Sequence, residues 1–277
     1  MSYLVIQGLE VETPDLKEIA KLSGSTRIEG LGNQAFRLHE YKTQEGVAAY
    51  CAGVKLDFAF VPKPRRVADF GLVAMDMDST LITIECIDEI ADLQGIKPEV
   101  AAITASAMRG EIDYPESLRR RVALLEGLPE SALQRVYDER LRLSPGAERM
   151  IERLRSLAIK TLLVSGGFTF FTERLKARLS LDYTLSNTIE IKNGKLTGQV
   201  LGPIVDAQAK AAKLRELRTE RQLSRDRVVA FGDGANDIAM MAEAGVSIAY
   251  HAKPVVRERA TYCFDYVGLD GLLNLYV

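Results

Sequence analysis

Two apolar, strand-like segments of this chain end in clusters of acidic residues. The segment 70–75 runs directly into Asp76 and Asp78, and the segment 228–231 runs into Asp233. Buried carboxylates without a partner are costly, because unpaired charges resist removal from water. In open parallel sheets, ligands bind at the carboxyl ends of the strands. The two segments therefore predict a site for a hard cation, with a nucleophilic carboxylate beside it, at one edge of a parallel sheet.

The composition indicates an ordinary globular protein. The chain has 277 residues, of which 47% are hydrophobic and 27% charged, so it can form one large domain or two modest ones. A net charge of -2 and the lack of a basic block give no reason to expect a nucleic-acid or membrane partner. No signal peptide or apolar stretch of about 20 residues is visible. The scattered Cys51, Cys86 and Cys263 suit reduced thiols, so we expect a cytoplasmic protein.

The first 62 residues read as a small α+β domain. The expected strands are 3–7, 26–29, 35–39 and 56–61, and the expected helices are 13–22 and 44–51. This βαββαβ order is typical of a ferredoxin-like sandwich. The stiff, polar segment 61–66 follows it and is the expected linker.

From residue 67 onward the pattern becomes α/β. The expected strands are 70–75, 160–164, 227–231 and 246–250, and the expected helices are 145–157, 168–179, 206–221 and 236–244. Such alternation predicts right-handed βαβ units and a doubly wound parallel sheet.

Two segments interrupt this alternation. Residues 85–143 contain several helical patterns and no convincing strand, which predicts a helical cap inserted after the first strand of the sheet. The segment 189–200 carries Asn193-Gly194 at its centre, which predicts a β-hairpin. The expected division is therefore an N-terminal domain at 1–62, a core at 63–84 and 144–277, and a cap at 85–143.

The acidic strand ends suit a phosphoryl-transfer reaction. A carboxylate such as Asp76 can attack phosphorus and form an acyl phosphate, which divides a hydrolysis into two easier displacements. Because two anions repel, the attack needs a cation, and Asp233 offers Mg²⁺ a second oxygen ligand. Asp78 lies on the same side of the strand as Asp76 and can give a proton to the leaving alkoxide. Asp76 and Asp78 alone would equally suit a helix cap, but the second acidic strand end favours catalysis.

Other residues suit contact with a phosphate group. Ser165 and Gly166 follow the strand 160–164 and precede a helical run, an arrangement that binds anions. Lys210 lies in the first turn of an expected helix, against the helix dipole, which suggests that it faces an anion. In the last acidic loop, Asn236 can donate to phosphate and Asp237 can hold Lys210 or a metal-bound water. Each feature also has a plain structural explanation, as a glycine turn, a solvated lysine or a helix cap.

Together the motifs resemble those of a known family. The segments D-M-D-S-T at 76–80, V-S-G-G-F at 164–168 and G-D-G-A-N-D at 232–237, with a lysine between the last two, come in the order found in the haloacid-dehalogenase-like phosphohydrolases. Within that family the chain resembles the phosphoserine phosphatases, over roughly residues 67–277. The resemblance implies Asp76 as nucleophile and Asp78 as acid and base. It also implies Mg²⁺ on Asp76, Asp233 and the backbone carbonyl of Asp78, and phosphate contacts from Ser165, Gly166, Lys210 and Asn236.

The resemblance also assigns roles in the cap. Glu85 matches the residue that holds a substrate ammonium group, and Arg121 matches the arginine that holds a substrate carboxylate. Met108 and Tyr114 match lid positions over the site, the latter often a phenylalanine in the family. Arginine suits this task because its planar fork binds a carboxylate at two points. Without the resemblance, Glu85 and Arg121 would read as ordinary surface charges.

The expected activity is hydrolysis of O-phospho-L-serine to serine and phosphate through an aspartyl-phosphate on Asp76, the last step of serine biosynthesis. Transfer of the phosphoryl group to an alcohol such as homoserine is the alternative reaction, since it uses the same intermediate. A dehalogenase needs neither Asp78 nor Asp233. A non-catalytic sensor of amino acids or phosphoserine is a further alternative, because the N-terminal unit resembles ACT-type domains in the order of its elements. Such a unit can pair two subunits as a homodimer, or serve only as a structural appendage.

Overall fold

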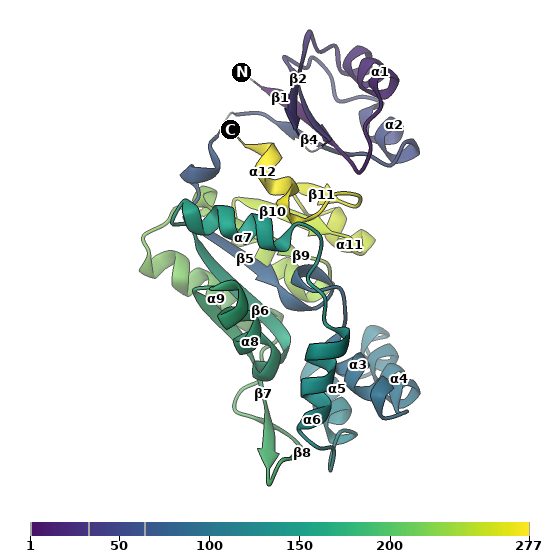
Figure 1. Cartoon of the computed structure of the whole chain (residues 1–277), viewed down its shortest axis with the longest axis vertical. Coiled ribbons are helices and arrows are strands. Elements are labelled where there is room, and N and C mark those ends of the chain that lie inside the picture. Colours follow the sequence, from purple (N-terminus) through teal and green to yellow (C-terminus); the bar gives the residue numbers. More distant parts are fainter. Residues whose placement is uncertain (1, 33, 64, 277) are drawn as a thin grey trace.

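The computed structural model describes residues 2–32, 34–63 and 65–276. Figure 1 shows a small sheet with two helices at one end of the molecule, a larger sheet in the middle and a group of short helices at the other end. The chain passes through these regions in that order but then returns to the middle, so the central sheet is assembled from segments on both sides of the helical group.

The N-terminal unit is a four-stranded antiparallel sheet with two helices. Its elements are β1 (Tyr3–Gln7), α1 (Thr13–Ser23), β2 (Arg27–Gly32), β3 (Ala35–His39), α2 (Val47–Gly53) and β4 (Asp57–Val61). The strand order in the sheet is β2-β3-β1-β4, and the elements follow one another in the predicted order βαββαβ. Helix α1 has a proline in its first turn and ends at Gly24, whose φ of 67° is left-handed. One face of the sheet packs on α1 and α2, through residues such as Leu4 and Ile19.

The other face of this small sheet packs against the central region. Val5 and Ala59 belong to the same buried cluster as residues of the larger sheet. The hydroxyl of Tyr3 donates to the carbonyl of Leu275, at 2.8 Å, in helix α12 (Leu272–Leu275). Figure 1 accordingly shows α12 beside the N-terminal unit, near both ends of the chain. Both faces of the sheet are therefore covered at β1, whereas the edge strand β2 is largely exposed.

The central sheet has seven strands in the order β11-β10-β9-β5-β6-β7-β8. Its strands are β5 (Leu72–Asp76), β6 (Lys160–Phe168), β7 (Tyr183–Lys192), β8 (Lys195–Leu201), β9 (Val228–Gly232), β10 (Val246–Tyr250) and β11 (Tyr262–Phe264). All neighbours are parallel except β7 and β8. The predicted doubly wound α/β fold is confirmed.

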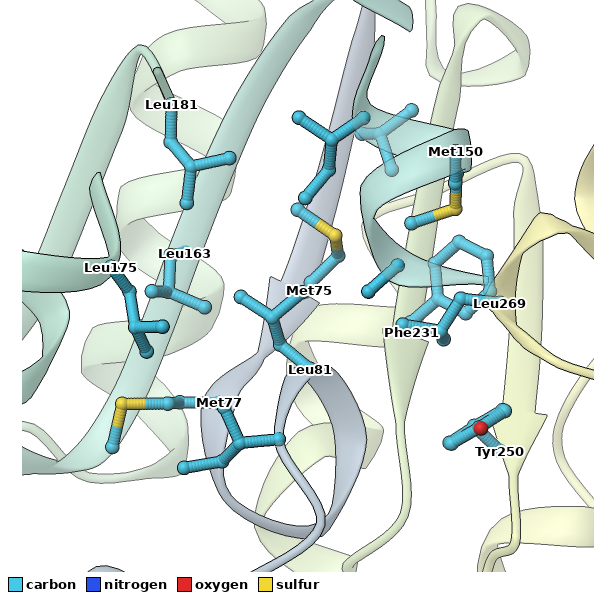
Figure 2. Close-up of a cluster of buried hydrophobic side chains, with 14 of the residues drawn as sticks. Met75, Met77, Leu81, Met150, Leu163, Leu175, Leu181, Phe231, Tyr250 and Leu269 are labelled. Atoms are coloured by element: carbon cyan, nitrogen blue, oxygen red, sulfur yellow. The ribbon is translucent and has the colours of Figure 1, made fainter. Parts of the chain in front are cut away.

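Helices cover both faces of this sheet, which is why its inner strands are continuous apolar runs. One face packs on α7 (Ala147–Ser156) and α8 (Thr169–Leu179). The opposite face packs on α9 (Ala207–Glu220), α10 (Ile238–Met241) and α11 (Pro254–Arg257). Figure 2 shows the first face, where Met75 of β5 and Phe231 of β9 gather with Met150 of α7. Buried aliphatic and aromatic side chains of this kind supply most of the stability of such a core.

The segment 85–143 is helical, as expected. It contains α3 (Cys86–Leu93), α4 (Lys97–Met108), α5 (Tyr114–Ala123) and α6 (Ser131–Arg135), followed by a π-type turn at Val136–Arg140. Ile82 and Leu143 form an isolated antiparallel bridge, so the two connections that lead into and out of this group lie side by side.

The predicted hairpin is also present, and it joins the helical group to the central sheet. Asn193 and Gly194 form its turn with φ values of 52° and 71°, as in a type I′ turn. The N–H of Gly127 donates to the carbonyl of Leu196, and the N–H of Leu196 donates to the carbonyl of Leu128, at 2.9 and 2.8 Å. These bonds attach the cap to strand β8 of the hairpin, and Figure 1 shows the hairpin beside α5 and α6.

Some elements differ from the expectation. Strand β6 continues past residue 164 to Phe168. The predicted helix 236–244 is reduced to α10, which follows a 3₁₀ turn at Ala235–Asp237. Strand β11 and the first half of β7 were not predicted.

None of the helices in the described ranges is long and apolar enough to cross a membrane. Cys51, Cys86 and Cys263 are free thiols, as predicted.

Candidate active site

Asp76 and Lys210 form a buried ion pair at the carboxyl end of the central sheet. Asp76 is the last residue of β5 and is 5% exposed, and Lys210 is 1% exposed. Helix α9 begins after Asp206, whose carboxylate accepts the N–H of Ala209, and this start places Lys210 in the first turn. The Lys210 Nζ lies 2.6 Å from Oδ1 of Asp76 and 2.8 Å from Oδ1 of Asp237. The lysine therefore points into the site, as its position against the helix dipole predicted.

Asp76, Asp237 and Lys210 together carry more negative than positive charge. Burial and the charge of Asp237 raise the pKa of Asp76 well above its usual value, against the opposing effect of Lys210. Burial alone would lower the pKa of Lys210, but the charges of Asp76 and Asp237 outweigh it and raise that pKa. Lys210 thus stays protonated and neutralises only part of the negative charge around it.

Asp233, at the end of the neighbouring strand β9, adds another carboxylate. Thr80 donates its hydroxyl to Oδ1 of Asp233 at 3.1 Å. Burial and the charge of Asp237 raise the pKa of Asp233 to about 6. Carboxylate oxygens of Asp76, Asp233 and Asp237 lie within 4.8 Å of one another. A set of hard oxygen donors with excess negative charge fits a divalent cation such as Mg²⁺.

Asp237 holds the acidic loop together. Its Oδ2 accepts the N–H groups of Asp233 and Gly234, at 3.2 and 3.1 Å, while its Oδ1 accepts from Lys210. A side chain at Gly232 would place its Cβ 2.4 Å from the Cβ of Asp237, so the loop needs glycine at that position. Because its oxygens already accept these three groups, Asp237 is better suited to orient Lys210 and the loop than to bind a metal directly.

Asp78 lies in the turn Met77–Leu81 directly after β5, and its backbone is extended, with φ of -66° and ψ of 137°. Its Oδ1 accepts the N–H of Cys86 at 2.9 Å, and its Oδ2 accepts the hydroxyl of Ser165 at 3.2 Å. Burial raises the pKa of Asp78, although both hydrogen bonds act in the opposite direction. A carboxyl group with a raised pKa can carry a proton and give it up during a reaction, as a general acid must.

Ser165 and Gly166 lie in the stretch at the end of β6, next to β5. Ser165 is fully buried, and its Oγ accepts the N–H of Gly167 at 2.8 Å. The carbonyl of Gly166 accepts two donors, the hydroxyl of Tyr114 at 3.1 Å and the side-chain amide of Asn187 at 2.8 Å. Burial raises the pKa of Tyr114 to about 12, so this hydroxyl keeps its proton at neutral pH. Tyr114 therefore links the cap to the last residues of β6, which include Ser165.

Comparison with known proteins identifies the family. The model of the haloacid dehalogenase-like hydrolases matches residues 73–242, and a second model, a domain of unknown function (DUF4072), matches residues 4–44. The chain belongs to the haloacid dehalogenase-like hydrolases. A phosphoserine phosphatase of Polaromonas sp. is 54% identical over 215 residues, which are 76% of this chain and 91% of that protein. A phosphoserine phosphatase of Haemophilus influenzae is 49% identical, over 80% of this chain and 70% of the relative.

Solved structures agree with this assignment. A haloacid dehalogenase family hydrolase of Salmonella enterica has a TM-score of 0.89 and 34% identity, with 99% of this chain and 98% of that chain covered. A probable phosphoserine phosphatase of Vibrio cholerae has a TM-score of 0.87 and 39% identity, with coverages of 99% and 85%. A substrate-bound phosphoserine phosphatase has a TM-score of 0.70 and 38% identity, over 75% of this chain and 99% of the other.

In this haloacid dehalogenase-like hydrolase, the remaining predicted site residues differ in their exposure to solvent. Ser79, whose φ of 54° is left-handed, donates its hydroxyl to Glu85 at 2.7 Å. The surrounding protein and the charge of Asp78 raise the pKa of Glu85 to about 7. Arg121 is half-buried in α5, whereas Asn236 is exposed, and Met108 at the end of α4 is 73% exposed. The structure therefore does not bury Met108 over the acidic residues.

Two residues of this hydrolase's site were not predicted from the sequence. Thr80 supports Asp233, and Asn187 supports Gly166. Thr80 is part of the D-M-D-S-T segment, so its motif offered a signal. Asn187 offered a different one, since a buried asparagine inside a strand is uncommon and needs hydrogen-bond partners.

Proposed function

We propose that this chain is a phosphoserine phosphatase, which hydrolyses O-phospho-L-serine to L-serine and phosphate. The observation that carries the proposal is the carboxylate of Asp76, which is held by Lys210 beside Asp233 at the end of the central sheet. The likeness to proteins named phosphoserine phosphatase, at about half identity over three quarters of the chain, supports the substrate. In a cell we place this activity in the cytoplasm, as the last step of serine biosynthesis.

The first half of the reaction forms a bond between Asp76 and phosphorus. An oxygen of Asp76 attacks the phosphoryl group, and the bond from phosphorus to the serine oxygen breaks. Asp78 gives its proton to that leaving oxygen, for which its raised pKa suits it. Lys210 lies beside Asp76 and stabilises the charge of the transferring group.

In the second half, water attacks the phosphorus of the aspartyl-phosphate. Asp78, now ionised, takes a proton from that water, and the bond between Asp76 and phosphorus breaks to release phosphate. The N–H of Gly166 and the amide of Asn236 are proposed donors to the phosphate oxygens. The hydroxyl of Ser165 is a third, and its single hydrogen would turn from Asp78 to the phosphate on binding.

A divalent cation completes the proposed site. Asp76, Asp233 and the backbone carbonyl of Asp78 are the residues that would hold Mg²⁺. The raised pKa of Asp233 fits this assignment, because burial and the charge of Asp237 outweigh the opposing charges of Lys253 and Lys210. When bound, the cation reduces the repulsion between Asp76 and the phosphate.

The cap supplies the proposed contacts for the serine part of the substrate. Glu85 would hold the ammonium group, and Arg121 would hold the carboxylate through its two-pronged fork. Tyr114 and Met108 would close over the bound substrate. The exposed position of Met108 fits a lid residue only if it moves onto the substrate on binding.

We also propose the division of the chain into 1–62, 63–84 with 144–277, and 85–143. The two connections at Ile82 and Leu143 support the last boundary, since they lie side by side where the cap leaves the core. A homodimer formed through the N-terminal unit, and an ACT-like role for that unit, stay predictions.

One panel of substrates tests the function. Phosphate release is measured with Mg²⁺ on phosphoserine, phosphothreonine, phosphoethanolamine and sugar phosphates, with homoserine added as a competing acceptor. We expect phosphoserine to give by far the highest kcat/KM and homoserine to leave phosphate release unchanged. Phosphorylated homoserine as the main product would replace hydrolysis by phosphoryl transfer. A sensor would release no phosphate from any substrate.

A further inference from the structure

We propose that Asn187 is a positioning residue of the active site, which fixes the peptide group between Gly166 and Gly167 and, through it, the hydroxyl of Ser165. This inference rests on the proposed phosphatase function, and it adds to that function a residue outside the cluster of acids. It is carried by hydrogen bonds that run from strand β7 to Asp78.

Asn187 is buried where strand β7 leaves the central sheet. It is 1% exposed, and it is aligned with Phe168 just after the pairing of β6 and β7 shifts register. Its Nδ2 donates to the carbonyl of Gly166 at 2.8 Å, and its Oδ1 accepts the N–H of Val205 at 2.8 Å. A buried amide is costly unless both of its ends are satisfied, and here both ends bind backbone groups next to the active site.

The first of these bonds controls the orientation of one peptide plane. The carbonyl of Gly166 and the N–H of Gly167 belong to the same planar group, so a donor that holds the carbonyl also aims the N–H. That N–H donates to Oγ of Ser165 at 2.8 Å, and Ser165 donates its own hydrogen to Oδ2 of Asp78 at 3.2 Å. Such a series is cooperative, because each bond polarises the next. Asn187 thereby directs the Ser165 hydroxyl toward the proposed general acid.

The second bond reaches the other side of the site. Val205 directly precedes Asp206, which caps helix α9, and Lys210 lies in the first turn of that helix. A shift of Val205 would move the start of α9 and with it the ammonium group that holds Asp76. The side chain of Asn187 therefore links both the end of β6, with Ser165, and the start of α9, with Lys210, to strand β7.

Tyr114 provides a useful contrast, because its hydroxyl reaches the same Gly166 carbonyl from the cap. A side chain at Gly166 would place its Cβ 2.2 Å from this hydroxyl, so the contact needs glycine there. When a cap opens to admit substrate, a donor on the cap leaves with it. Asn187 lies on a strand of the core and stays, so it keeps the peptide in place in both states.

The test begins with Asn187→Asp, which keeps the size of the side chain but sets an oxygen against the Gly166 carbonyl. We expect kcat to fall about tenfold or more, with KM changed less than about threefold, because the misplaced hydroxyl acts mainly in the transition state. Thr197→Val is the matched control. Thr197 is a β8 residue of the same hairpin, and it donates to Glu190, away from the site. This control should keep wild-type kcat.

A double-mutant cycle separates positioning from mere stability. Asn187→Asp is measured again in a Ser165→Ala background, where there is no hydroxyl left to position. We expect its effect on kcat to shrink to less than about threefold there. An undiminished tenfold loss in that background, or wild-type kcat for Asn187→Asp alone, would overturn the proposal. If the aspartate variant does not fold, Asn187→Thr replaces it, since its short hydroxyl cannot bind both partners.

Each measurement is made on phosphoserine and on p-nitrophenyl phosphate. The double-mutant cycle concerns Ser165, a proposed contact to the phosphate group that both substrates share. The coupling between Asn187 and Ser165 should therefore be the same on both substrates. If wild-type protein hydrolyses only the aryl phosphate, the proposed substrate fails while the role of Asn187 is still decided by the cycle.

Discussion

Lys210 is bonded to two carboxylates at once, and this shapes what a change at Asp76 will do. Because the lysine keeps its 2.8 Å contact with Asp237 when Asp76 is neutral, the buried ammonium group does not lose all of its partners. Removing a single partner from a buried charge is severe only when nothing else compensates it.

Asp76→Asn should therefore abolish turnover and leave the fold intact. We expect kcat for phosphoserine to fall by about 10⁴-fold or more, because an amide cannot form the covalent intermediate. Phosphate release measures the loss, and thermal unfolding followed by circular dichroism checks the fold. A variant that keeps substantial activity would exclude Asp76 as the nucleophile.

Arg121 and Arg120 are neighbours in sequence with different surroundings. Arg120 is exposed and paired with Glu116 at 2.7 Å, whereas Arg121 is half-buried. Arg121→Ala should raise KM for phosphoserine about 100-fold, since a charged hydrogen bond is worth about 1.5–3 kcal/mol, and should change use of p-nitrophenyl phosphate little. Arg120→Ala is the control and should match wild type on both substrates. Equal losses on both substrates for Arg121→Ala would remove it from carboxylate recognition.

Glu85 gives the site a pH dependence of its own. Its pKa of about 7 means that the carboxylate is ionised above that pH and neutral below it. Since only the ionised form attracts an ammonium group, the kcat/KM ratio of phosphoserine to p-nitrophenyl phosphate should fall about tenfold between about pH 8 and about pH 6. The ratio removes the titration of the phosphate that both substrates share. Glu85→Gln should give a lower ratio that no longer changes with pH, and a slope that survives this substitution would assign the titration to another group.

At the scale of helices and strands, continuous runs of apolar residues predicted the buried strands most reliably. Strands β5 and β9 are buried on both faces, so their sequences are continuous and were predicted nearly to the residue. Strand β11 has three residues, too few to show the alternation of apolar and polar residues that marks a strand.

The residues of the site were predictable where they follow the end of a strand, as Asp76 and Asp233 do. Asn187 could not be predicted in its role, because its partners Gly166 and Val205 are distant in sequence and meet it only in the folded sheet.

The hairpin β7–β8 approaches the cap at Gly198, whose φ is 78°. A Cβ there would lie 3.1 Å from the Cβ of Glu126 and 3.3 Å from the backbone of Ala123. Gly198→Ala should therefore destabilise the protein by about 1–2 kcal/mol from the left-handed backbone alone, and by more from the contact. Gly194→Ala is a matched control, because Gly194 also has a positive φ but nothing within 4 Å.

Urea unfolding gives the two free energies, and hydrogen exchange reports the bonds between cap and hairpin. Gly198→Ala should lose more stability than Gly194→Ala and should speed exchange at the amides of Gly127 and Leu196. Equal losses for the two variants would mean that the hairpin is not pressed against the cap.

At the scale of the whole molecule, Asp57 fastens the N-terminal unit to the core. Its carboxylate accepts the N–H groups of Asp265, Tyr266 and Val267 at 2.8, 2.9 and 3.0 Å. Beside it lies a cavity of about 530 Å³ between the two regions. Sequence patterns identified both regions but not this contact, because it joins residues more than two hundred positions apart.

Asp57→Ala should destabilise the protein by about 2–3 kcal/mol, because it removes the shared acceptor of three part-buried backbone N–H groups. Glu18→Ala, which removes only an exposed pair with Lys21, should cost less than about 1 kcal/mol. Urea unfolding measures both. If Asp57→Ala has the same free energy of unfolding as wild type, water must replace the carboxylate, and these hydrogen bonds do not stabilise the contact between the two regions.

The bond from Tyr3 to Leu275 joins residues that are 272 positions apart. A ribosome makes the first strand long before it makes the helix that covers it. During synthesis the early sheet must therefore wait with an apolar surface open to water, a condition in which chaperones bind nascent chains. The N-terminal sheet can therefore bury this face only after the segment with Leu275 has been synthesised.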